Sequence, residues 1–168
     1  VSNTGAINGG TRIDAPISYR DLTPANGGGF YAVAATIGNP VTVHLIRYNA
    51  GFTATWDYTI SNLTFVTQVW QEPGGAIYVT GTGTFNNRSR AVLLRFTDNG
   101  TQPTLNWLRY LDDGETLYSG GGYWFLPPNQ IAFADGRDPA TGGFGLQEAF
   151  LSVSDMNLTS CITQNGTV

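Results

Sequence analysis

The sequence predicts an all-β protein made of three antiparallel β repeats of about 50 residues each. Helical periodicity with capping signals is nearly absent. Short apolar runs rich in Val, Ile, Tyr, Phe and Thr are separated by Gly, Pro and Asn, as in Phe30–Thr36 and Val43–Tyr48. Similar residues also recur at a nearly constant spacing, since Trp56 and Trp107 lie 51 residues apart. With 168 residues, we expect one domain.

The first two repeats share an order of local signals, whereas the third is a weaker match that lacks the double glycine, the arginine and the tryptophan. A Gly-Gly turn leads into a strand with small residues, which would let neighbouring sheets approach closely. A second strand with larger aliphatics follows, then a turn such as Asn99-Gly100 and a tryptophan. We expect two sets of three residues to occupy equivalent positions: Tyr31, Tyr78 and Ala132, and Leu45, Leu93 and Phe150. The predicted boundaries are residues 1–21 for an N-terminal strand or arm, 22–62, 63–113 and 114–163 for the repeats, and 164–168 for a tail.

The most regular repeat runs from Gly74-Gly75 through Tyr78 to Arg95 and Trp107. This pattern resembles the blade repeats of secreted bacterial β-propeller proteins, and the resemblance covers roughly residues 22–163. In those proteins the last repeat often carries Cys in place of Trp, as at Cys161. The resemblance implies propeller-blade-like sheets and secretion, but no particular activity, because such repeats serve many functions.

The segment of residues 13–19 is predicted to be a single strand without a complete repeat of its own. The third repeat ends near Cys161, where its outermost strand should begin. We therefore expect the N-terminal segment to add a strand there, within this chain or in a neighbouring chain, because strand addition satisfies a row of unpaired backbone groups. The candidate residues for this strand donation are Ile13, Ala15, Ile17 and Tyr19.

The composition disfavours several partners. The net charge is −4, only 12% of residues are charged, and all eight basic residues are arginines. A nucleic-acid-binding protein needs a basic stripe, so no nucleic-acid partner is expected. No stretch approaches the ~20 apolar residues of a membrane span. Cys161 is the only cysteine, which excludes an internal disulfide and leaves open a bond to another chain or a buried thiol.

Five Asn-x-Ser/Thr sequons are candidate glycosylation sites. The 13 Asn and 29 Ser plus Thr of the chain would produce roughly two by chance, so the excess is modest. Glycosylation in an extracellular chain and a compositional accident both remain open. Asn99 and Asn165 precede Gly-Thr in turn-like contexts and are the best candidates. The five residues are Asn62, Asn87, Asn99, Asn157 and Asn165.

No known catalytic motif is present, and we expect no enzyme activity and no catalytic residue. His44 is the only histidine, and it lies in an alternating strand with no supporting motif. Two acidic segments, residues 112–115 and 135–138, could contribute oxygen ligands to calcium. Neither has the spacing of a dedicated calcium loop, so solvated turns are the favoured interpretation and no cofactor is expected.

An aromatic run at Tyr123, Trp124 and Phe125 has two interpretations. The three side chains could form an exposed platform for stacking on a sugar or a contact between subunits. Alternatively, they could form the outer strand of the third repeat with part of the run in the core, which is the favoured interpretation.

These observations predict a non-enzymatic, extracellular structural or assembly protein, a β-repeat glycoprotein that self-associates as a filament or surface layer. The expected partners are further copies of the chain, in a homo-oligomer or filament, and possible glycans. The alternative is an extracellular propeller module that binds carbohydrate or protein through aromatic residues on its loops.

Overall fold

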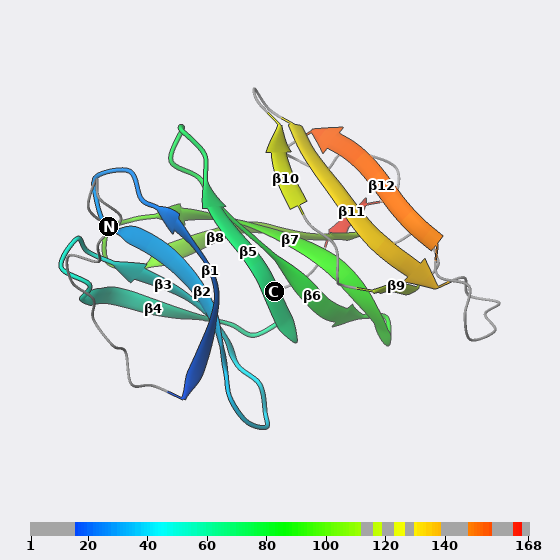
Figure 1. The fold of residues 1–168 in the computed structure, drawn as a ribbon, viewed down its shortest axis with the longest axis horizontal. Helices are drawn as coiled ribbons and strands as arrows, with labels where there is room; N and C mark the ends of the chain where they lie inside the picture. Colours follow the sequence, from blue (N-terminus) through cyan, green and yellow to red (C-terminus); the bar gives the residue numbers. More distant parts are fainter. Residues whose placement is uncertain are drawn as a thin grey trace, which may run out of the picture.

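A computed structural model describes residues 16–111, 116–118, 123–126, 130–138, 148–155 and 163–165 of the chain. The predicted all-β class is confirmed for these residues, which contain strands and turns but no helix. The strands form three separate antiparallel sheets rather than a closed propeller, and the second sheet lies between the other two in Figure 1.

The first sheet has the strand order β1-β2-β3-β4 and is a simple up-and-down meander. The second sheet has the order β13-β8-β7-β6-β5, and in the third sheet β11 pairs with β9, β10 and β12. The strands of the first sheet are β1 (Ile17–Pro24), β2 (Phe30–Thr36), β3 (Val43–Tyr48) and β4 (Ala54–Ile60). Those of the second are β5 (Phe65–Gln71), β6 (Ile77–Phe85), β7 (Arg88–Asp98), β8 (Pro103–Leu111) and β13 (Thr163–Asn165). Those of the third are β9 (Thr116–Tyr118), β10 (Tyr123–Leu126), β11 (Gln130–Asp138) and β12 (Glu148–Asp155).

The first and second sheets share one pairing register. In the first sheet Tyr31 pairs with Arg47, which pairs with Trp56. In the second sheet the same order of residue types recurs, from Tyr78 through Arg95 to Trp107. A register shift follows the arginine in both sheets, and both first strands carry one as well, between Tyr19/Asp21 and Val66/Gln68. The predicted equivalence of Tyr31 with Tyr78 and of Leu45 with Leu93 is therefore confirmed at the level of strand pairing.

The third sheet departs from this register. Leu45 pairs with Val33, two positions along β2 from Tyr31. Phe150 pairs instead with Asp135, which is three positions along β11 from Ala132. A shift of one residue exchanges the two faces of a strand, so Phe150 is not the counterpart of Leu45. The third repeat also lacks the double glycine, the arginine and the tryptophan that mark the first two.

The N-terminal strand differs from its prediction. β1 begins at Ile17, ends at Pro24 and pairs along its length with β2, so the predicted boundary at residue 21 falls inside it. A five-residue turn joins β1 to β2, and closing so short a loop costs little chain entropy compared with reaching a distant sheet. The strand that pairs with the outer edge of the second sheet is β13, opposite Leu111 of β8. Ile13, Ala15 and Cys161 lie outside the described residues.

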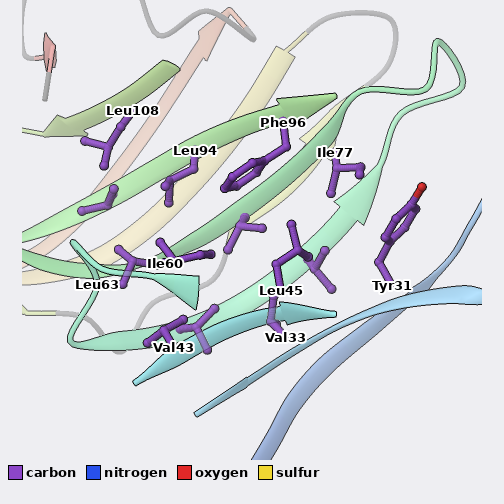
Figure 2. Packing of buried hydrophobic residues seen from close by; sticks show 14 of the residues in the cluster. Tyr31, Val33, Val43, Leu45, Ile60, Leu63, Ile77, Leu94, Phe96 and Leu108 are labelled. Carbon is purple, nitrogen blue, oxygen red and sulfur yellow. The ribbon is translucent and has the colours of Figure 1, made fainter. Parts of the chain in front are cut away.

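The main core fills the space between the first and second sheets (Figure 2). The inward residues of β2 and β3, such as Val33 and Leu45, are fully buried against Leu94 and Phe96 of β7. Burial of each such side chain stabilises the fold by about 1.5–3 kcal/mol. The two-residue period of a strand places Tyr31 and Val33 on this face, whereas Ala32 and Ala34, which are also buried, lie on the opposite face.

The sequence suggested that small residues in this strand let a neighbouring sheet approach, but at Gly81 the close neighbours are the adjacent strand and the preceding connection. A Cβ there would lie 2.2 Å from the carbonyl oxygen of Phe65 in the neighbouring strand and 3.1 Å from Leu63 Cδ1. Leu63 belongs to the connection between the first and second sheets, which also runs over Gly83. The glycines therefore make room for this connection and for the edge strand β5, not for a neighbouring sheet.

Candidate functional site

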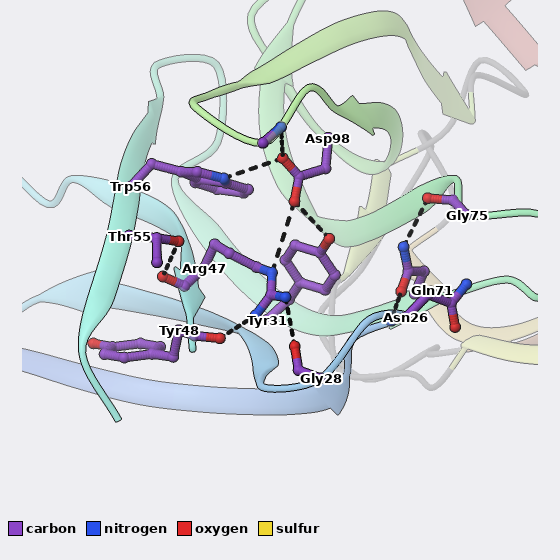
Figure 3. Close-up of polar contacts among 11 residues, drawn as sticks. Asn26, Gly28, Tyr31, Arg47, Tyr48, Thr55, Trp56, Gln71, Gly75 and Asp98 are labelled. Atoms are coloured by element: carbon purple, nitrogen blue, oxygen red, sulfur yellow. Dashed lines mark hydrogen bonds and ion pairs between the residues drawn. The ribbon is translucent and has the colours of Figure 1, made fainter. Parts of the chain in front are cut away.

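The most elaborate polar cluster joins the first sheet to the second around one carboxylate (Figure 3). Asp98, at the end of β7, accepts a hydrogen bond from the Tyr31 hydroxyl at 2.7 Å and from the Trp56 indole Nε1 at 3.2 Å. It also accepts one from the backbone N–H of Gly100 at 2.7 Å, which fixes the turn after β7. Trp56 and Tyr31 belong to the first sheet and Asp98 to the second, so the carboxylate bridges the two sheets.

Arg47 places a positive charge beside this carboxylate. Its Nε lies 3.7 Å from Asp98 Oδ2, and its guanidinium carbon lies 4.9 Å from the centre of the Tyr31 ring. The same guanidinium donates hydrogen bonds to the carbonyl oxygens of Gly28, at 2.5 Å, and Tyr48. The side chains of Arg47 and Asp98 are only 14% and 16% exposed. A mostly buried pair with further hydrogen bonds holds fixed geometry, because leaving either charge unpaired would be costly.

The turn before β2 is shaped to fit this arginine. Gly29 has a φ of 76°, and a Cβ at this residue would overlap the carbonyl oxygen of Tyr48 and the Arg47 guanidinium. Only glycine combines this backbone conformation with so close an approach. The Gly-Gly signal of the sequence therefore belongs to the same cluster as Arg47.

Burial raises the pKa of Tyr31 to about 12, and the hydrogen bond to Asp98 adds to this shift. Because the unfolded chain has a tyrosine pKa near 10, the neutral hydroxyl stabilises the fold fully below pH 10. This contribution is lost as the pH rises from 10 to about 12.

We expect the free energy of unfolding to fall between pH 10 and 12, by about 1.4 kcal/mol per pH unit for this one proton. Urea unfolding at several pH values would measure the slope. The Tyr31→Phe variant should show a shallower slope, although Tyr48 and Tyr78 also have pKa values raised by burial. Equal slopes in the variant and the wild type would contradict the assignment to Tyr31.

A shallow pocket of about 250 Å³ lies over the cluster. It is smaller than the ~300–1,000 Å³ typical of small-molecule sites, and the two charged groups in it face each other. The arrangement is therefore suited to holding two sheets together rather than to binding a charged ligand. The pocket is lined by Gly27, Gly28, Arg47, Asn49, Ala50, Thr55, Asp98 and Gly100.

The equivalent row of the second sheet lies on the face turned away from the first. Arg95 donates from Nε to the Tyr78 hydroxyl at 3.2 Å and lies 4.0 Å from Glu72 Oε1. Trp70 stacks on Tyr78 with ring centres 4.4 Å apart, and Trp107 meets the same ring edge-on. The residue types therefore match those of the first sheet, but the carboxylate comes from the same sheet.

A second link between the sheets involves β1 and β5. The carboxylate of Asp21 accepts a hydrogen bond from the backbone N–H of Val69 at 3.0 Å. The Arg20 guanidinium lies 4.9 Å from the centre of the Phe65 ring. These contacts satisfy part of the edge of β5, which an open sheet otherwise leaves unpaired.

The predicted glycosylation sites have different surroundings. Asn87 is exposed in the two-residue turn between β6 and β7, where it and Asn86 have positive φ angles, as type I′ hairpin turns require. Asn99 is exposed in the turn after β7, and Asn62 is half-buried after β4. Asn165 lies in β13, whose side chains are outside the described part, as is Asn157. Whether any of them carries a glycan stays a prediction.

The other predicted site residues that the structure describes lie on β10 of the third sheet and on β1 of the first. Tyr123, Trp124 and Phe125 form most of β10, with Trp124 opposite Ala132 of β11, and their side chains lie outside the description. Ile17 and Tyr19 lie in β1, opposite Thr36 and Ala34 of the first sheet. Strand donation to another chain stays a prediction.

Two features were not predicted from the sequence. Asp98-Asn-Gly100 has the composition of a hairpin turn. The role of the Asp98 carboxylate as a bridge between two sheets was therefore not recognised. His44 Nδ1 lies 2.9 Å from Asp57 Oδ1 on the adjacent strand, a pair that the spacing of these residues in an alternating pattern could have indicated.

Within the described residues, no group of three or more His, Cys, Asp or Glu side chains is placed to hold a metal ion. Residues 112–115 are outside this part, and the side chains of Asp135 and Asp138 in β11 are not described. The described residues also contain no helix that is long and apolar enough to cross a membrane.

Comparison of the chain with known protein families, with curated proteins and with solved structures yields no match.

Proposed function

We propose that the chain is a non-enzymatic, extracellular structural protein that self-associates through stacked, propeller-blade-like β repeats. The observation that carries this proposal is the shared register of the first two sheets together with the way in which they stack. Arg47 of the first sheet faces the second sheet, whereas its counterpart Arg95 faces away from the first sheet.

Equivalent faces of the two sheets are therefore not in contact with each other. The face of the first sheet that carries Tyr31 packs on the face of the second sheet that carries Leu94. The counterpart of Tyr31 in the second sheet is Tyr78, which lies on the other face of that sheet. Such a head-to-tail contact can be repeated indefinitely, whereas a contact between identical faces ends after two. Repeat proteins build extended assemblies from contacts of this kind.

The extracellular assignment is supported by composition and by exposure. Asn87 and Asn99, two of the five sequons, lie exposed in turns where a glycan would project into solvent. The surface is built with few charges, no lysine and a net charge of −4. On this proposal the partners are further copies of the chain in a homo-oligomer or filament.

The test is the mass of the purified chain as a function of concentration, measured by light scattering after size-exclusion chromatography. We expect species with masses of several times 18.0 kDa, increasing with concentration. A mass that stays at one chain over the whole concentration range would contradict the proposal.

A further inference from the structure

The outer face of the first sheet, which is the face turned away from the second sheet, has an unusual apolar surface. Leu22 is 64% exposed and Phe52 is 52% exposed, and between them Phe30 stacks on Tyr48 with ring centres 4.8 Å apart. Ala32 forms the floor of a groove of about 440 Å³ beside these residues. We call this surface the outer groove; it is lined by Tyr19, Arg20, Asp21, Leu22, Phe30, Ala32 and Phe52.

The matching row of side chains in the second sheet is covered by the first sheet. Leu22, Ala32 and Ile46 form one cross-strand row of the first sheet. In the shared register, the matching row of the second sheet contains Val69, Val79, Leu94 and Leu108. Each of those four side chains is at most 3% exposed, because the first sheet packs on them. In the first sheet Ala32 and Ile46 are also buried, at 1% and 3% exposed, so the difference between the two rows lies in Leu22, which is 64% exposed where its counterpart Val69 is 3% exposed. The outer groove is thus the position at which the next sheet would stack.

The turn between β3 and β4 holds Phe52 in the open groove. Phe52 has a φ of 62°, which is unfavourable for a large side chain. Asn49 maintains the turn, because its side-chain oxygen accepts hydrogen bonds from the N–H groups of Gly51 and Thr53 at 2.9 and 3.0 Å. The Phe52 ring packs against Phe30, with ring centres 5.6 Å apart, yet half of its surface stays exposed and is available to a further apolar contact.

We propose that the outer groove binds a second copy of this chain, whose sheet stacks on it head to tail as the first sheet stacks on the second. The inference rests on the proposed self-association and names the surface that carries it. A second copy is the occupant that fits best, because this chain already contains a sheet-on-sheet contact in the matching register. The groove is also mainly apolar, and its charged residues, Arg20 and Asp21, have opposite signs.

The experiment compares the concentration-dependent mass of four proteins by sedimentation velocity. Leu22→Asp and Phe52→Asp each put a charge into the proposed contact, and Asp suits the positive φ at position 52 better than Phe does. Ile37→Asp is the matched control, because Ile37 is 70% exposed in the turn between β2 and β3 and does not line the groove. Unfolding midpoints close to wild type should show that all four proteins fold.

We expect the two groove variants to weaken association at least tenfold, and the Ile37→Asp control to associate like the wild type. A wild type that associates while both groove variants associate equally well would overturn this inference and leave self-association standing. A wild type that remains a monomer at every concentration would overturn both. If the control loses association to the same extent as the groove variants, the effect belongs to added charge in general and the groove assignment is wrong.

Discussion

The Asp98→Ala variant is expected to lose about 3 kcal/mol of unfolding free energy. The change removes the acceptor for the Tyr31 hydroxyl, the Trp56 indole and the Gly100 amide, and it leaves the Arg47 guanidinium without its counter-charge in a mostly buried position. Each buried donor left without a partner costs about 1–3 kcal/mol, and such losses overlap within one network. Urea unfolding at neutral pH would measure the difference.

The matched control for this prediction is Asp57→Ala. Asp57 also bonds a side chain on the neighbouring strand, His44, but its own side chain is 50% exposed. Exposed pairs of this kind contribute at most about 1 kcal/mol. If both variants lose the same small amount of stability, Asp98 does not hold the two sheets together.

The Gly81→Ala variant is expected to be destabilised by about 3 kcal/mol, although it adds only one methyl group. The new Cβ would lie 2.2 Å from the Phe65 carbonyl oxygen, which belongs to the backbone of β5 and cannot turn aside. The edge strand and the connection that contains Leu63 would both have to move away from β6. Thermal or urea unfolding, with circular dichroism to follow the strands, would measure the loss.

Gly74→Ala provides the control for this second substitution. A Cβ at Gly74 would meet only the flexible side chain of Glu72, at 3.4 Å, and the residue is exposed. Its stability should therefore change by no more than about 0.5 kcal/mol. A Gly81→Ala protein as stable as the Gly74→Ala protein would show that β5 does not pass as close to β6 as described.

The strand pattern of the first two repeats could be predicted from the sequence because its signals are local. The recurring order of turns and strands placed Leu45 and Leu93 in equivalent positions, and the spacing of Trp56 and Trp107 reflects an equivalence of register. The partner of β1 was not predicted, although a turn signal lies next to it. The predicted strand, residues 13–19, ended before the glycine-rich turn of residues 26–29, so that turn was not recognised as the link between β1 and β2.

The polar cluster around Asp98 could be predicted only in part, because its residues are contributed by two different sheets. Tyr31 and Trp56 stood out as repeat markers, but Asp98 looked like an ordinary turn residue. Its role follows from long-range packing, which brings a turn of one sheet to the side chains of another. The exposure of Phe52 was not predictable either, since it depends on a positive φ in a turn of unusual sequence.

Hydrogen exchange in assembled and in diluted samples tests the central claim most directly, because it locates the contact without changing the sequence. If copies stack on the outer groove, backbone amides in peptides that contain Leu22 and Phe52 should exchange more slowly in the assembled sample. Amides around Trp56 and Asp98, which already lie in the contact between the first and second sheets, should exchange at the same rate in both samples. Slowed exchange elsewhere, with Leu22 and Phe52 unchanged, would contradict the account.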